Sequence, residues 1–314
     1  AGVQMDIRTL AAMGVHGAAA ITANTAQNNR EVLAIQPVDS AVLAEQLRAV
    51  ESLPIAAIKV GLIPGGAQLA TIRAFVENSS VPLVYDPVLA GSCGDALTES
   101  DLTVALKSKL LPLCTLLTPN RQEAEKLSGL TIGNSDDVEI AARALLATGV
   151  KAVLLKGGHG KGPLSQDFFC SEEQTFWLTS PRLTTDHSRG TGCALSSAIA
   201  AALALGYALA DAVVIGKMDI NQGLRQGYGI ADDGGPVAIS HFPNQQYDLP
   251  LLTRSANIDP EARAFPPCAN TPLGLYPIVD RAAWLARLLP TGITTVQLRV
   301  KDLEGDALKR EVSM

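Results

Sequence analysis

The sequence predicts an α/β fold built on a mainly parallel sheet with helices on both faces. Short apolar segments that suit buried strands alternate along the chain with longer segments in which apolar residues recur at helical spacing. The loops between them are short, which favours parallel strands joined by helical crossovers. Residues 166–180 alternate like a β-hairpin.

The alternation begins with a helix over residues 2–13. A short strand over 17–22 is expected next, followed by the polar loop 23–29. Ser40 is expected at the start of the second helix, since serine is a favoured capping residue. The further expected strands are 55–61, 82–88, 114–120 and 151–158. The further expected helices are 40–52, 65–79, 99–112, 121–129 and 135–149.

Composition and charge exclude several classes of protein. The 314 residues carry a formal net charge of −6 and no basic stripe, which argues against nucleic acid and anionic membrane as partners. No apolar window is long enough to span a bilayer. The cysteines are scattered without CxxC spacing, so we expect neither disulfides nor a zinc site, and a cytoplasmic location. They are Cys93, Cys114, Cys170, Cys193 and Cys268.

Composition and apolar periodicity divide the chain into three parts. Residues 1–240 form the α/β domain, and residues 241–271 form a proline-rich linker. Residues 272–314 repeat the strand–helix pattern and read as the opening of a second domain, too short to bury a core alone. Both ends of the chain fall inside helical segments, so we expect the natural polypeptide to extend beyond them.

Ligands of open α/β sheets bind beyond the carboxyl ends of the strands. Six polar or glycine-rich loops follow expected strands or open helices, and we expect them to gather at one edge. These loops are 23–29, 60–66, 85–95, 118–124, 156–160 and 187–193.

The last of these loops contains Gly190, Thr191, Gly192 and Cys193, followed by a run of small apolar residues. Glycines allow close backbone approach to a ligand, and a helix start offers unpaired N–H groups and a positive dipole end. Together they make an anion hole that stabilises charge on a phosphoryl group. The same field is expected to lower the pKa of the Cys193 thiol, so that the thiolate acts as a base. The alternative is a helix start with small residues for close packing.

The segment resembles the anion-hole signature of the ribokinase-like kinases. Cysteine at position 193, where most of these kinases have aspartate, is typical of the hydroxymethylpyrimidine and hydroxymethylpyrimidine-phosphate kinases of thiamine biosynthesis. Other segments are similar to motifs of that family in the same order: "AGVQMDIRTL", "AITANTAQN", "IKVGLI", "DPV", "LLTPNRQEAEKL" and "VLLKGGH". The resemblance covers roughly residues 1–240 and implies a three-layer α/β/α fold.

The resemblance implies a pyrimidine pocket made by Asp6, Gln27, Leu62 and Val88. A carboxylate and an amide suit an aminopyrimidine, which has both donors and acceptors, while Leu62 and Val88 would be apolar walls. From the residues alone, Asp6 reads equally as a solvated helix residue and Gln27 as a capping group of a loop.

The resemblance also implies sites for ATP and Mg²⁺. Lys156 would meet the ATP phosphates as a point charge, and Asn120 and Glu123 would form the magnesium and phosphate loop, with Glu123 holding metal-bound waters. The alternatives are a surface lysine at a strand end and a capping box in which Asn120 and Glu123 close a helix start.

The sequence departs from the family pattern at two places. Arg189 stands where the family commonly has histidine directly before the first glycine; an arginine can still contact phosphate. The family's first strand and glycine-rich turn would precede Ala1.

The tail resembles the start of thiamine phosphate synthase, a TIM-barrel enzyme. Gln297, Arg299 and Lys301 alternate, so they share one face of a strand and could hold a pyrophosphate. A strand with one polar exposed face is the alternative.

The expected function is ATP- and Mg²⁺-dependent phosphorylation of 4-amino-5-hydroxymethyl-2-methylpyrimidine and of its monophosphate. Small-molecule substrates and a second copy of the chain in a homodimer are the expected partners. The alternatives are a pyridoxal kinase and a non-catalytic pyrimidine-binding module.

Overall fold

The computed structural model describes residues 2–28, 31–89, 102–158, 160, 162–230, 234–258 and 275–313. The chain divides into two compact units, residues 1–257 and residues 258–314. Cys93, Cys268 and residues 259–271 of the expected linker 241–271 lie outside the described residues.

The larger unit is built on a seven-stranded sheet with the order β3-β4-β5-β6-β7-β8-β9. The strands β3 to β6 run parallel, and β7, β8 and β9 extend the sheet in antiparallel pairs. The predicted hairpin is confirmed as β7 and β8. The strands are β3 (Ile58–Val60), β4 (Leu83–Tyr85), β5 (Leu116–Leu117), β6 (Ala152–Leu155), β7 (Leu164–Ser171), β8 (Thr175–Pro181) and β9 (Leu251–Thr253).

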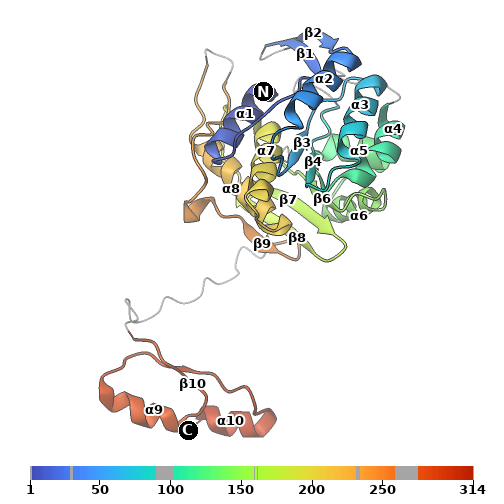
Figure 1. Cartoon of the computed structure of the whole chain (residues 1–314). Helices are drawn as coiled ribbons and strands as arrows, with labels where there is room; N and C mark the ends of the chain where they lie inside the picture. The colour runs from blue at the N-terminus through green and yellow to red at the C-terminus, as the bar shows by residue number, and fades with distance from the viewer. Residues whose placement is uncertain are drawn as a thin grey trace. The chain divides into compact units, whose positions relative to one another are not determined.

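Helices cover both faces of this sheet, which confirms the predicted three layers (Figure 1). One apolar cluster joins one face to α2 (Ser40–Val50), α3 (Gly66–Val76), α4 (Leu102–Lys109), α5 (Arg121–Ser128) and α6 (Ser135–Leu146). A second cluster joins the other face to α1 (Val3–Ala12), α7 (Thr191–Ala204) and α8 (Leu209–Arg225). A short 3-10 turn, η1 (Leu111–Leu113), precedes β5.

The strand β6 shows why these segments read as continuous apolar runs. Ala152 and Leu154 pack into the cluster with α7 and α8, whereas Val153 and Leu155 pack into the opposite cluster. Successive side chains of a strand point to opposite faces, and both faces of this sheet are buried. All four residues are therefore apolar and buried.

The region after α1 differs from the sequence expectation. Residues 17–22 form no strand; instead β1 (Ala23–Gln27), expected as a loop, pairs antiparallel with β2 (Val32–Pro37). The reason lies in tertiary contacts: the Ile21 amide donates to Gln46 Oε1 at 2.8 Å, and Thr22 Oγ1 donates to the Leu62 carbonyl at 2.7 Å. These bonds replace a strand ladder over 17–22.

The cap of α2 also differs from the expectation. Asp39, not Ser40, is the N-cap, and its Oδ1 accepts from the Ala41 amide at 2.8 Å. Its backbone is extended, as a capping residue requires, whereas Ser40 is the first helical residue.

Residues 241–257, expected as part of the linker, lie within the larger unit. The strand β9 pairs with β8, and η2 (Gln246–Asp248) is held by α8, because Arg225 Nε donates to Asp248 Oδ1 at 2.8 Å. Prolines remove the apolar period here, but backbone pairing and a buried ion pair attach the segment.

The smaller unit has the predicted order of strand, helix, strand and helix. The strands β10 and β11 pair in parallel. A 3-10 turn, η3 (Leu289–Thr291), follows α9. Its elements are β10 (Ile278–Val279), α9 (Ala283–Leu288), β11 (Gln297–Leu298) and α10 (Gly305–Ser313).

Within the described residues, no helix combines the length and the apolar character needed to cross a membrane. The expected homodimer and cytoplasmic location stay predictions.

Candidate active site

The first turn of α7 carries the glycine-rich motif. Gly190 is the N-cap with φ 84°, a left-handed conformation that favours glycine, and no side chain of the described residues caps this helix start. A Cβ at Gly190 would lie 2.8 Å from Met5 Cε of α1. The motif therefore leaves the helix's first N–H groups without a side-chain cap, as an anion-binding helix tip requires.

Gly192 faces the charged part of the site. A Cβ at this position would lie 3.4 Å from Lys156 Nζ and 3.7 Å from Asp86 Oδ2. The absence of a side chain at Gly192 thus keeps open the space between the tip of α7 and the Lys156 ammonium.

Lys156 forms a buried ion pair with Asp86, which follows β4. Lys156 Nζ donates to Asp86 Oδ1 at 2.8 Å, and Thr118 and Ser196 hydroxyls lie 3.3 and 3.4 Å from the same carboxylate. Burial alone would raise the pKa of Asp86, but the charges of Lys156 and Lys59 outweigh burial and lower it. From this segment the sequence resemblance assigns only Val88 to the site, and Asp86 is a further residue there.

A second buried pair joins Asp6 of α1 to Lys59 of β3. Lys59 Nζ donates to Asp6 Oδ1 at 2.9 Å, and Ser197 Oγ donates to the same oxygen at 2.9 Å. Burial alone would lower the pKa of Lys59, but Cys193, Asp6 and Asp86 together raise it. Asp6 is thus a partly buried, paired carboxylate, not a solvated helix residue. Lys59 was missed because its partner lies 53 positions away.

Cys193 lies one helical turn before Ser197, and its thiol does not have the lowered pKa that the sequence predicted. Burial raises the pKa of Cys193, while Lys59 and a hydrogen bond from the Gly2 backbone oppose the rise only in part. The neighbouring carboxylates Asp86 and Asp6 add to the rise. Desolvation therefore outweighs the field of the helix start.

Asn120 and Glu123 form the capping box expected from the sequence. Asn120 Oδ1 accepts from the Glu123 amide at 2.9 Å, and Glu123 Oε2 accepts from the Asn120 amide at 2.7 Å. Burial raises the pKa of Glu123 to about 7, and Lys156 opposes this rise. The Lys156 amide donates to the Pro119 carbonyl at 2.8 Å, which attaches this loop to the lysine. The capping box is therefore present, and the role of both residues in binding Mg²⁺ and phosphate stays a prediction.

The donors present fit a magnesium ion held largely through water. The described part of the chain contains no group of three acidic, histidine or cysteine side chains able to hold a metal directly. Mg²⁺ usually keeps several waters and binds through one or two carboxylates. Burial raises the pKa of Glu123 and the charge of Asp86 raises it further, and a bound cation would favour the ionised carboxylate.

The remaining predicted pocket residues lie on separate elements. Leu62 and Val88 are partly buried in the loops after β3 and β4, whereas Gln27 is exposed on β1. Arg189 Nη1 donates to the Asn28 carbonyl at 3.3 Å, so the end of β1 contacts the residue next to Gly190. The role of Gln27 in the pyrimidine pocket stays a prediction.

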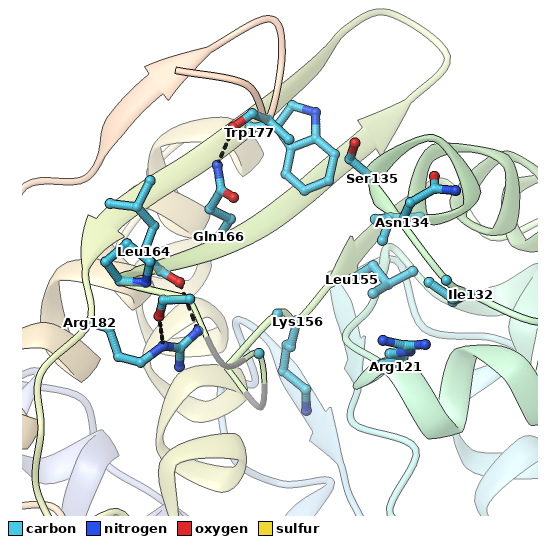
Figure 2. A pocket seen from close by; sticks show the side chains of 17 residues that line it. Arg121, Ile132, Asn134, Ser135, Leu155, Lys156, Leu164, Gln166, Trp177 and Arg182 are labelled. Atoms are coloured by element: carbon cyan, nitrogen blue, oxygen red, sulfur yellow. Dashed lines mark hydrogen bonds between the residues drawn. The ribbon is translucent and has the colours of Figure 1, made fainter. Parts of the chain in front are cut away.

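Two cavities border these residues. One of about 360 Å³ has Lys156, Gly157, Trp177 and Arg182 in its wall; Figure 2 shows Lys156 extending away from Trp177. Another of about 250 Å³ has Met5, Arg189, Tyr228 and Pro236 in its wall. Neither is lined by Cys193.

In the smaller unit, the three predicted pyrophosphate ligands are exposed. Gln297 lies on β11, and Arg299 and Lys301 follow it. Tyr276 Oη donates to Gln297 Oε1 at 3.3 Å.

Solved structures place the larger unit in a class. A phosphomethylpyrimidine kinase from Clostridium difficile is similar, with a TM-score of 0.62 and 34% identity, over 70% of this chain and 91% of that chain. A pyridoxal kinase from Staphylococcus aureus, in complex with AMP-PCP and pyridoxal, gives a TM-score of 0.72 and 26% identity, over 81% of this chain and 92% of that chain. The protein thus has the ribokinase-like α/β fold.

Sequence comparison narrows the class to a family. The family model described as phosphomethylpyrimidine kinase matches residues 1–238. A hydroxymethylpyrimidine/phosphomethylpyrimidine kinase from Rhizobium meliloti is 38% identical over 245 residues, 77% of this chain and 92% of the relative. The chain belongs to the phosphomethylpyrimidine kinase family and is a phosphotransferase of thiamine biosynthesis.

One relative is longer. The thiamine biosynthesis bifunctional protein ThiED of Geobacter sulfurreducens is 36% identical over 239 residues, which are 76% of this chain and 49% of that protein.

Proposed function

We propose that the larger unit transfers the γ-phosphoryl group of ATP to the hydroxymethyl oxygen of 4-amino-5-hydroxymethyl-2-methylpyrimidine, and then phosphorylates the resulting monophosphate. The observation that carries this proposal is the uncapped tip of α7, with Cys193 in its first turn and Lys156 beside Gly192. This arrangement suits phosphoryl transfer, in which positioning and charge stabilisation supply most of the catalysis.

The proposed step is an in-line displacement. The hydroxymethyl oxygen forms a bond to the γ-phosphorus, the bond from that phosphorus to the β,γ-bridging oxygen breaks, and ADP leaves with the bond electrons. Cys193 Sγ accepts the hydroxyl proton, the amides of Gly190 to Cys193 stabilise the equatorial oxygens, and Lys156 neutralises phosphate charge.

The raised pKa of Cys193 makes the base scarce at neutral pH. Only the thiolate can take a proton, so activity should increase as the pH rises towards the thiol pKa. Lys59 favours the thiolate through its charge, which gives this lysine a supporting role in the proposed mechanism.

Glu123 and Asn120 are the residues proposed to hold Mg²⁺, Glu123 through metal-bound waters. When bound, the ion would neutralise charge on the ATP phosphates. The capping box positions the Glu123 carboxylate for this role by fixing it on the Asn120 amide.

Asp6, Gln27, Leu62 and Val88 are the proposed pyrimidine-binding residues. Lys59 and Ser197 hold Asp6 Oδ1 from two elements, so its carboxylate has a defined orientation. A rigid acceptor suits the exocyclic amine of an aminopyrimidine.

We also propose that residues 272–314 begin a thiamine phosphate synthase domain of the TIM-barrel type, with Gln297, Arg299 and Lys301 as pyrophosphate ligands. The parallel pairing of β10 with β11 around α9 supports a βαβ start. The likeness of the chain to a bifunctional thiamine biosynthesis protein gives the fusion a precedent.

A pyridoxal kinase is the second candidate, favoured by the likeness to the Staphylococcus aureus enzyme. The test is a coupled ADP-release assay on the purified chain, with the pyrimidine alcohol, its monophosphate and pyridoxal compared as substrates. We expect kcat/KM to be highest for the pyrimidine alcohol. A higher value for pyridoxal would reassign the substrate, and binding without ADP release would indicate a non-catalytic module.

The base is tested in the same assay. We expect Cys193→Ala to lower kcat by about 100- to 10,000-fold, the usual contribution of a general base. Cys193→Asp should retain more activity than Cys193→Ala. Its activity should also begin to rise at a lower pH than that of the unaltered chain, because a carboxylate ionises at lower pH than a thiol. Equal kcat values for Cys193→Ala and the unaltered chain would remove Cys193 from the base role.

A further inference from the structure

A third buried ion pair lies beside the loop that follows Lys156. Lys217 of α8 donates through Nζ to Asp167 Oδ2 of β7 at 2.8 Å, and each side chain is only 6% exposed. Lys217 Nζ also donates to Ser165 Oγ at 3.0 Å. Neither residue belongs to a motif that the sequence resemblance identifies.

Asp167 connects this pair to the site. Its other oxygen, Oδ1, accepts a hydrogen bond from the Gly157 amide at 2.8 Å. Gly157 is the residue directly after Lys156, so the carboxylate fixes the backbone at the point where the lysine side chain leaves the chain.

The backbone at this point lies very close to β7. A Cβ at Gly157 would be 1.9 Å from the Gln166 carbonyl oxygen, so a side chain there would require the backbone to move. On the other side, the Lys156 amide donates to the Pro119 carbonyl at 2.8 Å. The peptide between Lys156 and Gly157 is therefore held between the end of β5 and β7.

Further along, the loop is held by a different residue. Figure 2 shows Arg182, just after β8, which donates to the carbonyl oxygens of Gly158, Gly162 and Leu164 at 2.6 to 2.7 Å. These three bonds hold Gly158, Gly162 and Leu164 and do not involve the Gly157 amide.

Stability alone does not explain the pair. Two buried charges lose their hydration, and apolar residues of similar volume often stabilise a fold as well or better. What an apolar pair cannot supply is an acceptor for the Gly157 amide. We propose that Asp167, oriented by Lys217, is a positioning residue that places Lys156 for phosphoryl transfer.

This inference rests on the proposed kinase function and deepens it. A misplacement of about 1 Å at a group that meets the reacting phosphates costs on the order of 100-fold in rate. If Asp167 positions Lys156, loss of the hydrogen bond from the Gly157 amide should lower kcat even in a variant that is fully folded at the assay temperature.

Two double variants isolate the acceptor. Asp167→Asn with Lys217→Met removes both charges and keeps a carbonyl oxygen for Gly157, whereas Asp167→Leu with Lys217→Met removes the acceptor as well. We expect the asparagine variant to keep kcat within about fivefold and the leucine variant to lose about 100-fold. In both, KM for the pyrimidine should stay within about threefold, since no pyrimidine contact changes. If the leucine variant does not fold, Asp167→Ala with Lys217→Met replaces it.

Arg225→Met with Asp248→Asn is the matched control. It removes another pair made by α8, at 2.8 Å and with Asp248 fully buried, that does not contact the Lys156 loop. Tm is measured for every variant, and kcat is measured well below the lowest Tm. Equal kcat in the two Asp167 double variants, or an equal loss in the control, would overturn the inference. An unaltered chain without kinase activity would instead overturn the proposed function.

Discussion

The two units of the chain carry the same strand–helix pattern but differ in what they bury. In the larger unit, three Lys–Asp pairs lie at one edge of the sheet with little exposed surface: Lys59–Asp6, Lys156–Asp86 and Lys217–Asp167. Among residues 275–313 of the smaller unit, Ala282 alone is buried. Its predicted ligands alternate as expected, but they face water.

The difference is one of dielectric environment. A charge that is removed from water acts strongly on its neighbours. Burial raises the pKa of Asp86, but the charge of Lys156 helps to lower it below its usual value. The exposed pair Arg281–Asp302 of the smaller unit is screened by solvent. A strand–helix pattern thus predicts elements, whereas a working site also needs a core that excludes water.

Of the changes that test this comparison, Gly192→Ala is expected to have the largest effect, and it separates site function from fold. A methyl group at this position meets Lys156 Nζ at ordinary contact distance, and Gly192 needs no left-handed backbone. Alanine in a helix is favoured over glycine by about 1 kcal/mol, so Tm should not fall. The methyl group fills the space proposed for phosphate, and kcat should fall about 100-fold. Kinetics and thermal unfolding measure the two effects.

The outcome of Gly192→Ala tests whether the edge of the sheet is a site or only a packed core. Unchanged kcat with an unchanged Tm would mean that no phosphoryl group occupies this space. Ser108→Ala on the exposed side of α4, outside the loops of the site, is the control and should leave kcat unchanged.

Asp219 of α8 sharpens the contrast between paired and unpaired buried carboxylates. Within the described residues, neither of its oxygens has a hydrogen-bond partner, and burial raises its pKa from 3.8 to about 7. Because the folded state holds the proton more tightly than the unfolded chain, stability should fall as the pH rises from about 4 to about 7. The rise in pKa corresponds to about 4 kcal/mol.

Asp219→Asn should therefore raise the free energy of unfolding at pH 8 by about 4 kcal/mol and change it little at pH 4. Urea unfolding at both pH values measures the difference, and kcat should not change. A difference that does not depend on pH would show that Asp219 is paired in the folded protein.

Local signals in the sequence predicted much of the fold and part of the site. The capping box of Asn120 and Glu123 depends on residues three apart, and both of its hydrogen bonds are present. The hairpin of β7 and β8 and the three layers follow from apolar spacing. These features depend on neighbours along the chain, so the sequence contains their cause.

The rest depends on contacts between distant positions. Asp86 and Lys156 are 70 positions apart, and Asp167 and Lys217 are 50 apart, so no local pattern pairs them. The thiol of Cys193 illustrates the same limit, since desolvation by distant elements outweighs the helix start beneath it. The prediction of a strand over 17–22 was wrong because the Ile21 amide donates to Gln46 and the Thr22 hydroxyl donates to the Leu62 carbonyl.

The smallest expected effect comes from removing the smaller unit. A chain that ends at Asn257 keeps β9, all three buried Lys–Asp pairs and the bond from Gln166 Nε2 to the Ala256 carbonyl at 2.7 Å. We expect its kcat and the Tm of its main transition to match those of the full chain.

A chain that ends at residue 240 is the matched comparison, because it removes β9 and leaves Asn221 and Arg225 without Asp248. Buried polar groups without partners cost about 1–3 kcal/mol each, so its Tm should fall clearly. Equal Tm for both shortened chains would contradict the assignment of residues 241–257 to the larger unit, and a loss of kcat on ending at Asn257 would show that the kinase site depends on the smaller unit.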